Sequence, residues 1–364
     1  MKPPHPAVVA DADLADLLSR GVEAEASDLH LVVGYPPTFR IHGRLEDTGG
    51  ELLTAEVTAR MVTTVLPTEL RESLAQRHDL DFSLSLDYGT GARRFRVNVF
   101  YQQGSLGACF RFVPETIPTF QWMGFPSPLA DRIAALPGGL VMVTGVTGSG
   151  KTTTLAALVQ RINQEGHRRI ITIEEPIEYV FPPSPHSVVS QREVGVDVPT
   201  FADGLKFGLR QDPDVILVGE VRDPDTARMV MSAAETGHLV LTTVHTRDAR
   251  GAVTRLVDIF PADRQDDVRG QLSLSLQLVI SQHLIPSAHV GEKRVLAMEI
   301  LVASDPVRAA IRQNKIESID THIQTGKRFG MQTLDEDLIR LVIEQRIAGP
   351  DARRLAKNPN LIAG

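Results

Sequence analysis

Cysteine is almost missing from this chain, since Cys109 is the single one among 364 residues. One cysteine excludes an intrachain disulfide and a four-cysteine zinc site, and it suits a reducing compartment. Aromatic residues make up only 5% of the chain, so stacking platforms for single-stranded nucleic acid are scarce. Acidic residues outnumber basic ones by 45 to 38, which disfavours a protein built to coat nucleic acid.

Long apolar runs are missing as well. No run approaches the roughly 20 residues that a transmembrane helix needs, and the first residues lack the apolar core of a signal peptide. We therefore expect a soluble, intracellular protein. The composition is that of an ordinary globular protein, with 42% hydrophobic and 23% charged residues, and the length is typical of about two domains.

Residues 1–113 are predicted to form an α+β domain with an antiparallel sheet. Apolar residues at helical spacing predict helices, and alternating apolar residues predict strands. The expected helices cover residues 12–24 and 54–76; the expected strands cover residues 27–33, 38–45, 79–87, 93–102 and 105–113, with a turn at 88–91.

Arginines lie on the polar faces of the last two of these strands. Arg96 and Arg111 are far in sequence from any phosphate-binding motif. They are either solvated strand residues or guanidinium groups that stabilise phosphoryl transfer, often from an adjacent subunit.

Prolines punctuate the next stretch, and we place a linker at residues 114–120. Residues 121–285 then alternate short apolar strands with helices, which is typical of a parallel sheet covered on both faces. The strands are expected at 140–144, 169–173, 215–218 and 239–244, and the helices at 152–164, 202–211 and 224–236.

The C-terminal region, residues 286–364, is predicted to be mostly helical. Thr333 and Glu336 form a capping box before a helix over 334–347. Helical spacing of apolar residues extends the same expectation to residues 272–283.

One segment carries a specific chemical signal: Gly145–Thr152 fits G-x-x-x-x-G-K-[ST] between an apolar strand and a helix. Glycines let backbone N–H groups turn toward phosphate oxygens, and the helix N-terminus adds partial positive charge. Lys151 can reach the β- and γ-phosphates, and the Thr152 hydroxyl can ligate Mg²⁺. We expect ATP and Mg²⁺ here, with nucleotide contacts from Gly145, Thr147, Gly148, Ser149, Gly150, Lys151, Thr152 and Thr153. A glycine-rich turn without a ligand is the alternative.

Acidic residues end two strands of the predicted parallel sheet, at the edge where ligands bind in such folds. Glu220 ends one strand, where a carboxylate can orient and deprotonate an attacking water. Gly219 stands where a strand of this kind usually carries the Asp that contacts Mg²⁺. Glu174 and Glu175 follow another strand. They are either solvated acids or part of the cation site, Glu175 through a water.

A histidine, His245, lies at the end of the strand over 239–244. At that edge of the sheet it can sense the γ-phosphate, and a structural histidine is the alternative.

Taken together, these blocks resemble the bacterial secretion ATPase superfamily, and within it the PilT/PilU-like type IV pilus retraction ATPases. The likeness covers nearly the whole chain. The matching segments are 27–31 and 34–37 (opening of the N-terminal domain), 94–98 and 111 (arginine fingers), 172–178 (Asp box), 234–246 (His box) and 326–338 (C-terminal region). Glu175 replaces the more usual Asp of the Asp box.

The resemblance implies a PAS-like N-terminal domain followed by a RecA-like P-loop ATPase domain and a helical C-terminal region. It implies a homo-hexameric motor that hydrolyses ATP to drive pilus retraction in twitching motility. The implied catalytic residues are Glu220, Glu174, Glu175, His245, Arg96 and Arg111. The implied partners are an inner-membrane pilus platform protein and a paralogous retraction ATPase, with no nucleic acid and only peripheral contact at the inner face of the cytoplasmic membrane.

Fewer residues indicate to which branch of this superfamily the chain belongs. Extension ATPases usually carry a tetracysteine zinc insertion, which a chain with one cysteine lacks, so retraction is favoured over extension. Residues 308–314 match a PilT-like helix in part, whereas 191–197 and 272–276 are closer to PilU-like proteins, and this choice stays open.

Two other classes of protein are alternatives: a RecA-like nucleic-acid translocase and a non-catalytic subunit that only binds nucleotide. The acidic balance speaks against the first, and the intact Lys151, Thr152 and Glu220 speak against the second.

Overall fold

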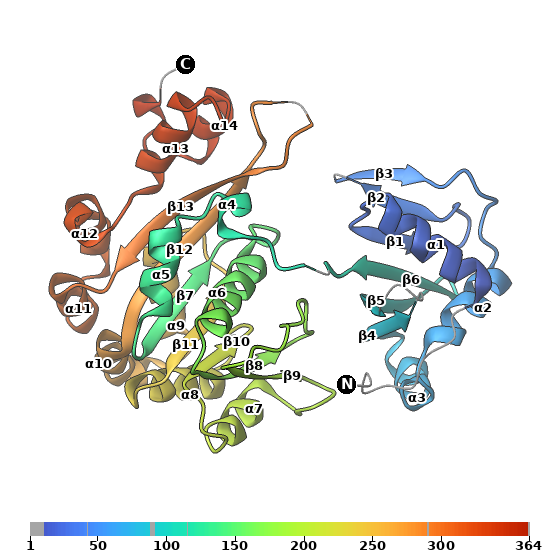
Figure 1. Ribbon diagram of the computed structural model, residues 1–364, viewed down its shortest axis with the longest axis horizontal. Helices are drawn as coiled ribbons and strands as arrows, with labels where there is room; N and C mark the ends of the chain where they lie inside the picture. Colours follow the sequence, from blue (N-terminus) through green and yellow to red (C-terminus); the bar gives the residue numbers. More distant parts are fainter. Residues whose placement is uncertain (1–10, 42, 88–91, 115, 290, 363–364) are drawn as a thin grey trace. The chain divides into compact units, whose positions relative to one another are not determined.

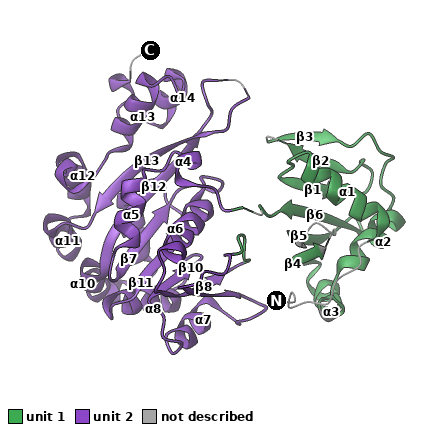
Figure 2. Ribbon diagram, viewed as in Figure 1, with its two compact units in different colours: residues 1–116, 176–180 green, residues 117–175, 181–364 purple. Residues whose placement is uncertain are grey.

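The computed structural model describes residues 11–41, 43–87, 92–114, 116–289 and 291–362. They divide into two compact units (Figure 2): residues 1–116 with 176–180 form unit 1, and residues 117–175 with 181–364 form unit 2. The turn expected at 88–91 lies outside the described residues. The domain limits expected at residues 113, 120 and 285 stay predictions.

Unit 1 contains a six-stranded antiparallel sheet in the order β3-β2-β1-β6-β5-β4 (Figure 1). The strands are β1 (Asp28–Leu31), β2 (Thr38–Ile41), β3 (Arg44–Asp47), β4 (Asp79–Asp87), β5 (Ala92–Gln102) and β6 (Ser105–Phe112). The helices are α1 (Ala12–Glu23), α2 (Ala55–Val65) and α3 (Thr68–Arg77).

The two faces of this sheet differ, as the alternating pattern predicts. Leu29 and Val97 both lie opposite Phe110 across the sheet, and these side chains join the apolar residues of α1 and α2 in one core. On the other face, Asp28 and Arg96 both lie opposite Arg111. The unit therefore has one buried face and one polar face.

Two predictions in unit 1 were too coarse. The helix expected at 54–76 is two helices, because Pro67 has no backbone N–H and stands between α2 and α3. The strand expected at 38–45 is the hairpin of β2 and β3.

Unit 2 contains a seven-stranded sheet in the order β13-β12-β7-β11-β10-β8-β9. The strands are β7 (Gly139–Thr144), β8 (Arg169–Glu174), β9 (Val188–Glu193), β10 (Val215–Val218), β11 (Leu239–Val244), β12 (Leu276–Ile285) and β13 (Val295–Val302). Neighbouring strands are parallel except for β12 and β13, which are antiparallel. This confirms the predicted parallel sheet.

The helices of unit 2 lie between these strands along the chain, and further helices precede β7 and follow β13. They are α4 (Phe120–Met123), α5 (Ser127–Ala134), α6 (Lys151–Glu165), α7 (Phe201–Gly208), α8 (Pro224–Glu235), α9 (Ala249–Asp258), α10 (Gln265–Ser275), α11 (Asp305–Arg312), α12 (Ile319–Thr325), α13 (Leu334–Ile343) and α14 (Gly349–Leu355). Short 3₁₀ helices cover Ala262–Arg264, Ile316–Ser318, Lys327–Phe329 and Pro359–Leu361.

The helix expected at 272–283 was wrong. α10 ends at Ser275, and the chain continues as β12, which lies beside β7. β12 is buried along almost its whole length, so its apolar residues do not alternate. A strand buried on both faces gives no period of two, and its apolar residues satisfied helical spacing by coincidence.

The outer strand β13 carries eight buried residues and is covered by the chain that follows it. Gln332 forms an antiparallel bridge with Ile300 of β13, and α13 packs on the same strand. α13 begins with the predicted capping box of Thr333 and Glu336, which is confirmed. Across the described residues, every helix is too short or too polar to cross a membrane.

Candidate active site

The turn between β7 and α6 has the geometry of a phosphate-binding loop. β7 is buried along its whole length, and α6 begins at Lys151 directly after the turn. Gly145, Gly148 and Gly150 have φ angles of 151°, 77° and 89°, which glycine adopts without strain. A Cβ atom on Gly145 would lie 2.3 Å from Ser149 Oγ, so only glycine fits there.

Two polar side chains of this loop are almost fully buried, with Ser149 1% and Lys151 8% exposed. The Lys151 ammonium donates to the carbonyl oxygens of Gly145 and Val146, at 3.0 and 3.1 Å. Within the described part of the chain, the Ser149 hydroxyl has no hydrogen-bond partner. A buried cation and an unsatisfied hydroxyl beside glycines of positive φ fit the phosphate groups of a nucleotide.

The remaining residues expected to touch the nucleotide lie in the same loop and in the first turn of α6. Thr147 is exposed in the loop, and Thr152 and Thr153 are half-buried. The next residue, Thr154, is buried and accepts a hydrogen bond from the Gln282 amide of β12 at 2.8 Å. No sequence pattern predicts this contact, because it joins residues 128 positions apart.

Glu220, which follows β10, lies in a cluster of charged residues. Its Oε1 is 2.5 Å from Arg222 Nη2, and its Oε2 is 3.3 Å from His245 Nε2. Arg222 also lies 3.8 Å from Glu175. The structure thus brings together residues that follow β8, β10 and β11, as expected for the carboxyl ends of parallel strands.

The environment of His245 keeps its ring neutral near neutral pH. Burial and the positive charge of Lys151 lower the pKa of His245 below its ordinary value of 6.5, although Glu220 opposes this shift. A neutral imidazole carries one N–H donor, which Glu220 can accept. The phosphate-loop lysine, the carboxylate and the histidine therefore belong to one electrostatic cluster.

The two acids after β8 differ although they are adjacent. Glu174 is buried, and its Oε1 accepts from Thr172 Oγ1 at 2.6 Å and from Gln191 Nε2 at 3.2 Å. The Glu175 side chain is 45% exposed and pairs with Arg222. Glu175 is therefore the more accessible of the two for a water-mediated cation contact.

Two features of the site escaped the sequence analysis. Arg222 follows Glu220 by two positions. This short distance between a cation and the expected base is the only feature of the sequence that indicates a role for Arg222. Thr144, at the end of β7, has its hydroxyl 2.7 Å from that of Thr246 and accepts from the Thr246 backbone N–H at 2.9 Å. This pair ties the phosphate-binding strand to the residue after His245.

The two arginines expected to act as fingers belong to unit 1. Arg96 and Arg111 are directly opposite each other on β5 and β6, which confirms that their strands are neighbours. Arg111 Nε donates to Asp28 Oδ1 at 2.8 Å, and Arg96 lies 3.7 Å from Asp81. Although burial opposes the charge, the bonds to Asp28 raise the pKa of Arg111. Their action at a nucleotide stays a prediction.

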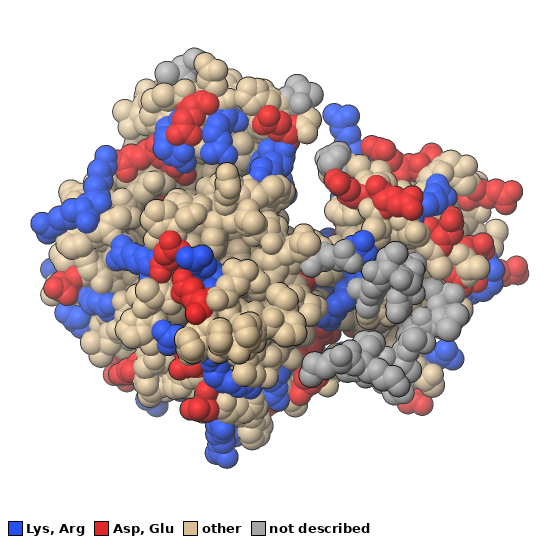
Figure 3. Space-filling view, viewed as in Figure 1, with Lys and Arg blue, Asp and Glu red and all other residues tan. Residues whose placement is uncertain are grey.

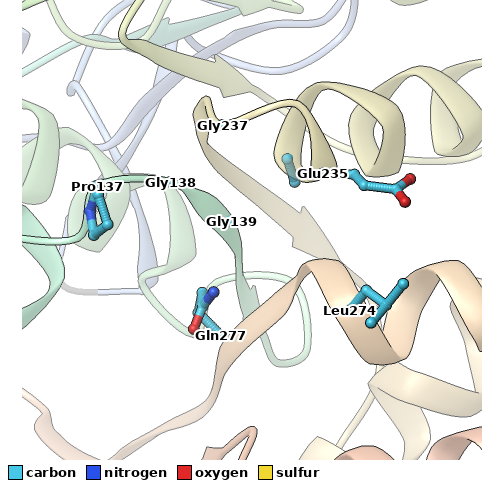
Figure 4. A pocket seen from close by; sticks show the side chains of 8 residues that line it. Pro137, Gly138, Gly139, Glu235, Gly237, Leu274 and Gln277 are labelled. Carbon is cyan, nitrogen blue, oxygen red and sulfur yellow. The ribbon is translucent and has the colours of Figure 1, made fainter.

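A separate pocket of about 380 Å³ opens at the other end of the parallel strands (Figure 4). Its lining residues are Pro137, Gly138, Gly139, Ala234, Glu235, Gly237, Leu274 and Gln277. Gly139 begins β7 and Gly237 precedes β11, so this pocket lies at the amino ends of these strands. The phosphate-binding loop follows the carboxyl end of β7, and the pocket is therefore not part of the nucleotide site.

Comparison with known proteins agrees with this geometry. The family described as "Type II/IV secretion system protein" matches residues 8–346. A twitching motility protein of Neisseria gonorrhoeae is 45% identical over 322 residues, covering 88% of this chain and 84% of that protein. The type IV pilus retraction ATPase PilT of Pseudomonas aeruginosa is 42% identical over 95% of this chain and 99% of its own length.

Among solved structures, a crystal structure of the pilus retraction motor PilT with bound ADP has a TM-score of 0.85 and 41% identity. It covers 95% of this chain, and this chain covers 98% of it. Fold, phosphate-binding loop and sequence thus agree over nearly the full length. The chain belongs to the type II/IV secretion system protein family, and within that family it is a PilT-like ATPase.

Proposed function

We propose that this protein is the ATP-driven motor that retracts type IV pili. The observation that carries the proposal is the match of 42–45% identity, over most of the chain, to proteins named for pilus retraction and twitching motility. The cluster of Lys151, Glu220 and His245 supports hydrolysis as the source of the work.

The chain's own residues divide the chemistry among themselves. The loop Gly145–Thr152 binds the phosphates of ATP through its backbone N–H groups, and Lys151 moves its ammonium from loop carbonyls to phosphate oxygens. Thr152 would hold Mg²⁺ directly, and Glu175 would hold it through a water. When bound, Mg²⁺ neutralises developing charge on the phosphates.

Glu220 takes the proton of the attacking water in this proposal. The Arg222 guanidinium pairs with the Glu220 carboxylate, and the neutral His245 donates to the same carboxylate. His245 thereby couples Glu220 to the residues after β11. Glu174 accepts hydrogen bonds from Thr172 and Gln191 and thereby fixes the end of β8, next to Glu175.

Arg96 and Arg111 complete the site from an adjacent subunit of a homo-hexamer. Guanidinium groups supplied across a subunit boundary stabilise the charge of phosphoryl transfer and link hydrolysis to subunit movement. Because Arg96 and Arg111 lie directly opposite each other on β5 and β6, their side chains can act on the same phosphate.

The proposal includes a cellular setting. The motor works in the cytoplasm, peripherally at the inner face of the cytoplasmic membrane, on an inner-membrane pilus platform protein and beside a paralogous retraction ATPase. The proposal includes no nucleic-acid partner, because acidic residues outnumber basic ones by 45 to 38. On the face that Figure 3 shows, the acidic and basic side chains of unit 2 are interspersed.

Deleting the gene and counting surface pili tests the proposal. Retraction predicts hyperpiliated, immotile cells, and wild-type protein restores motility whereas Lys151→Ala and Glu220→Gln do not. Bald cells would show that the protein extends pili instead. Normal pili and normal motility would overturn a role in the pilus.

A further inference from the structure

The short loop after β11, residues 245–248, is held from several strands at once. We call these residues the histidine loop, because they begin with His245. Thr144 of β7 binds Thr246, as described above. On β12, the Ser281 hydroxyl and His283 Nε2 both donate to the Arg247 carbonyl, at 3.0 and 3.1 Å.

The end of the histidine loop is fixed by a buried carboxylate from β13. Glu299 is 2% exposed, and its Oε1 accepts from the backbone N–H of Ala249, the first residue of α9, at 2.9 Å. Asp248 caps the same helix by accepting from Gly251 N–H at 2.6 Å. An acceptor for the first N–H groups of a helix stabilises its first turn.

The second oxygen of Glu299 has a cation from the C-terminal segment. Lys357 Nζ lies 3.1 Å from Glu299 Oε2 and 2.9 Å from Asp320 Oδ1. Although burial opposes its charge, the bonds to Asp320 and Glu299 raise the pKa of Lys357. Asp335 accepts from the backbone N–H groups of Lys357 and Asn358, which fixes the segment that carries the lysine.

This arrangement leaves Glu299 dependent on Lys357. A carboxylate that is almost fully buried is costly unless a cation and hydrogen-bond donors compensate it. Without the ammonium, the Glu299 carboxylate is buried without its cation and is compensated only by moving toward water. This movement alters the acceptor for Ala249 N–H, and with it the start of α9.

We propose that Glu299 and Lys357 are positioning residues for ATP hydrolysis, which hold His245 against Glu220 by fixing the histidine loop and the first turn of α9. The inference rests on the proposed roles of Glu220 and His245. It also makes the C-terminal segment around Lys357 a part of the hydrolytic machinery, although this segment is remote in sequence from every nucleotide-binding motif.

The expected signature is a loss of turnover without a loss of nucleotide binding. The contacts of the phosphate-binding loop are made by Gly145–Thr152 and do not pass through Glu299. In metal sites, substitution of a residue that orients a ligand typically lowers activity by roughly 10–100-fold, and we expect the same scale for a residue that orients His245. We therefore expect Lys357→Met to lower kcat by about this factor, with KM for ATP and Kd for mant-ADP unchanged within about twofold.

The chain offers a matched control on α13, where a buried carboxylate contacts the same strand. Asp337 is 2% exposed, accepts from the backbone N–H of Met298 at 2.8 Å, and pairs with Arg340. The Arg340 and Lys357 side chains are exposed to similar extents, 45% and 41%. Arg340→Met thus removes the cation from Asp337, a carboxylate as buried as Glu299. Asp337 is bonded to Met298, the residue before Glu299 on β13, and not to the histidine loop.

The decisive measurement compares kcat and Tm of Lys357→Met, Lys357→Arg and Arg340→Met in the full-length protein. We expect both methionine variants to lower Tm, only Lys357→Met to lower kcat, and Lys357→Arg to retain most of the turnover. Equal effects of the two methionine variants on kcat, or no effect of Lys357→Met on kcat, would overturn the proposal.

A double-mutant cycle separates this inference from the function on which it rests. If Lys357 acts through His245, the kcat of Lys357→Met/His245→Ala equals that of His245→Ala alone. Additive losses would overturn the positioning role while leaving the ATPase proposal intact. A wild-type protein that shows no ATP turnover would overturn the proposed function, and the inference with it.

Discussion

The two sheets of this molecule place their charged residues in opposite ways. In unit 1 the sheet has one polar face, so Arg96 in the middle of β5 and Arg111 near the end of β6 both lie within strands, beside carboxylates of the same unit. In unit 2 the inner strands are buried on both faces, so Glu220 and His245 follow strand ends.

The difference shows why one chain can carry two kinds of functional position. A one-sided antiparallel sheet can present a side chain anywhere along its exposed face. A doubly covered parallel sheet can present one only where its strands end. In the proposed motor, the parallel sheet supplies groups that must meet at one point, and the antiparallel face supplies groups for a neighbouring subunit.

The strongest test of this division mixes two inactive proteins. Arg96→Gln/Arg111→Lys subunits lack both guanidinium groups, while the lysine keeps a cation beside the buried Asp28. Removing an arginine finger lowers turnover by roughly 10³–10⁵-fold. We expect mixtures with Lys151→Ala subunits to recover ATPase activity that neither protein has alone.

Native mass spectrometry supplies the control for that mixture, because it shows whether rings containing both subunits form. Mixed rings without any recovered turnover would place the arginines and the phosphate-binding loop in sites built within one chain, or would assign the arginines no catalytic role.

The next test concerns the strand ends of unit 2. Glu220→Gln keeps the shape of the side chain but removes the base, so turnover should fall by roughly 10²–10⁴-fold while ATP still binds. Lys151→Ala is the contrasting variant, since it removes a phosphate contact and should weaken binding as well. Filter binding and phosphate release measure the two effects. Near-normal turnover of Glu220→Gln would assign the base to Glu174 or Glu175.

The smallest expected effect is a pH dependence of stability that differs between the units. Burial lowers the pKa of His283 in unit 2 and of His30 in unit 1 below the ordinary value of 6.5. The folded state therefore disfavours the protonated ring. The stability of the fold is unaffected by these histidines above pH 6.5, where the ring is neutral in both the folded and the unfolded state. Stability is lost as the pH falls below this value, because the unfolded state then binds the proton more readily.

Trp122 is the only tryptophan of the chain and belongs to unit 2, so its fluorescence follows that unit during urea unfolding. His283→Gln should flatten the loss of unit 2 stability between pH 7 and 5, and His30→Gln should leave the Trp122 transition unchanged. A flattening by His30→Gln of the same size would mean that the two units unfold together.

Sequence alone predicted the parts of the molecule that rest on local rules. The phosphate-binding loop, the capping box at Thr333 and the polar strand face of Arg96 follow from spacing, cap chemistry and alternation. Each of these signals is complete within about ten residues.

The parts that escaped depend on distant contacts. The sequence of β12 predicts a helix because burial on both faces erases its alternation, and only its pairing with β7 and β13 defines it as a strand. Glu299 and Lys357 are separated by 58 positions, and no periodic pattern joins them. The role of Arg222 likewise depends on the strand end that it shares with Glu220.

The coverage of β13 has a consequence for solubility. The two outer strands of the unit 2 sheet are protected differently: β9 carries Ser190, Gln191, Arg192 and Glu193, whereas every residue of β13 is buried. The Gln332 bridge to Ile300 occupies hydrogen-bonding groups on the open side of β13. Shortening the chain before residue 330 would uncover a long apolar strand edge, which is a template for intermolecular β-pairing. By covering β13, the C-terminal segment and its helices therefore also protect the protein from aggregation.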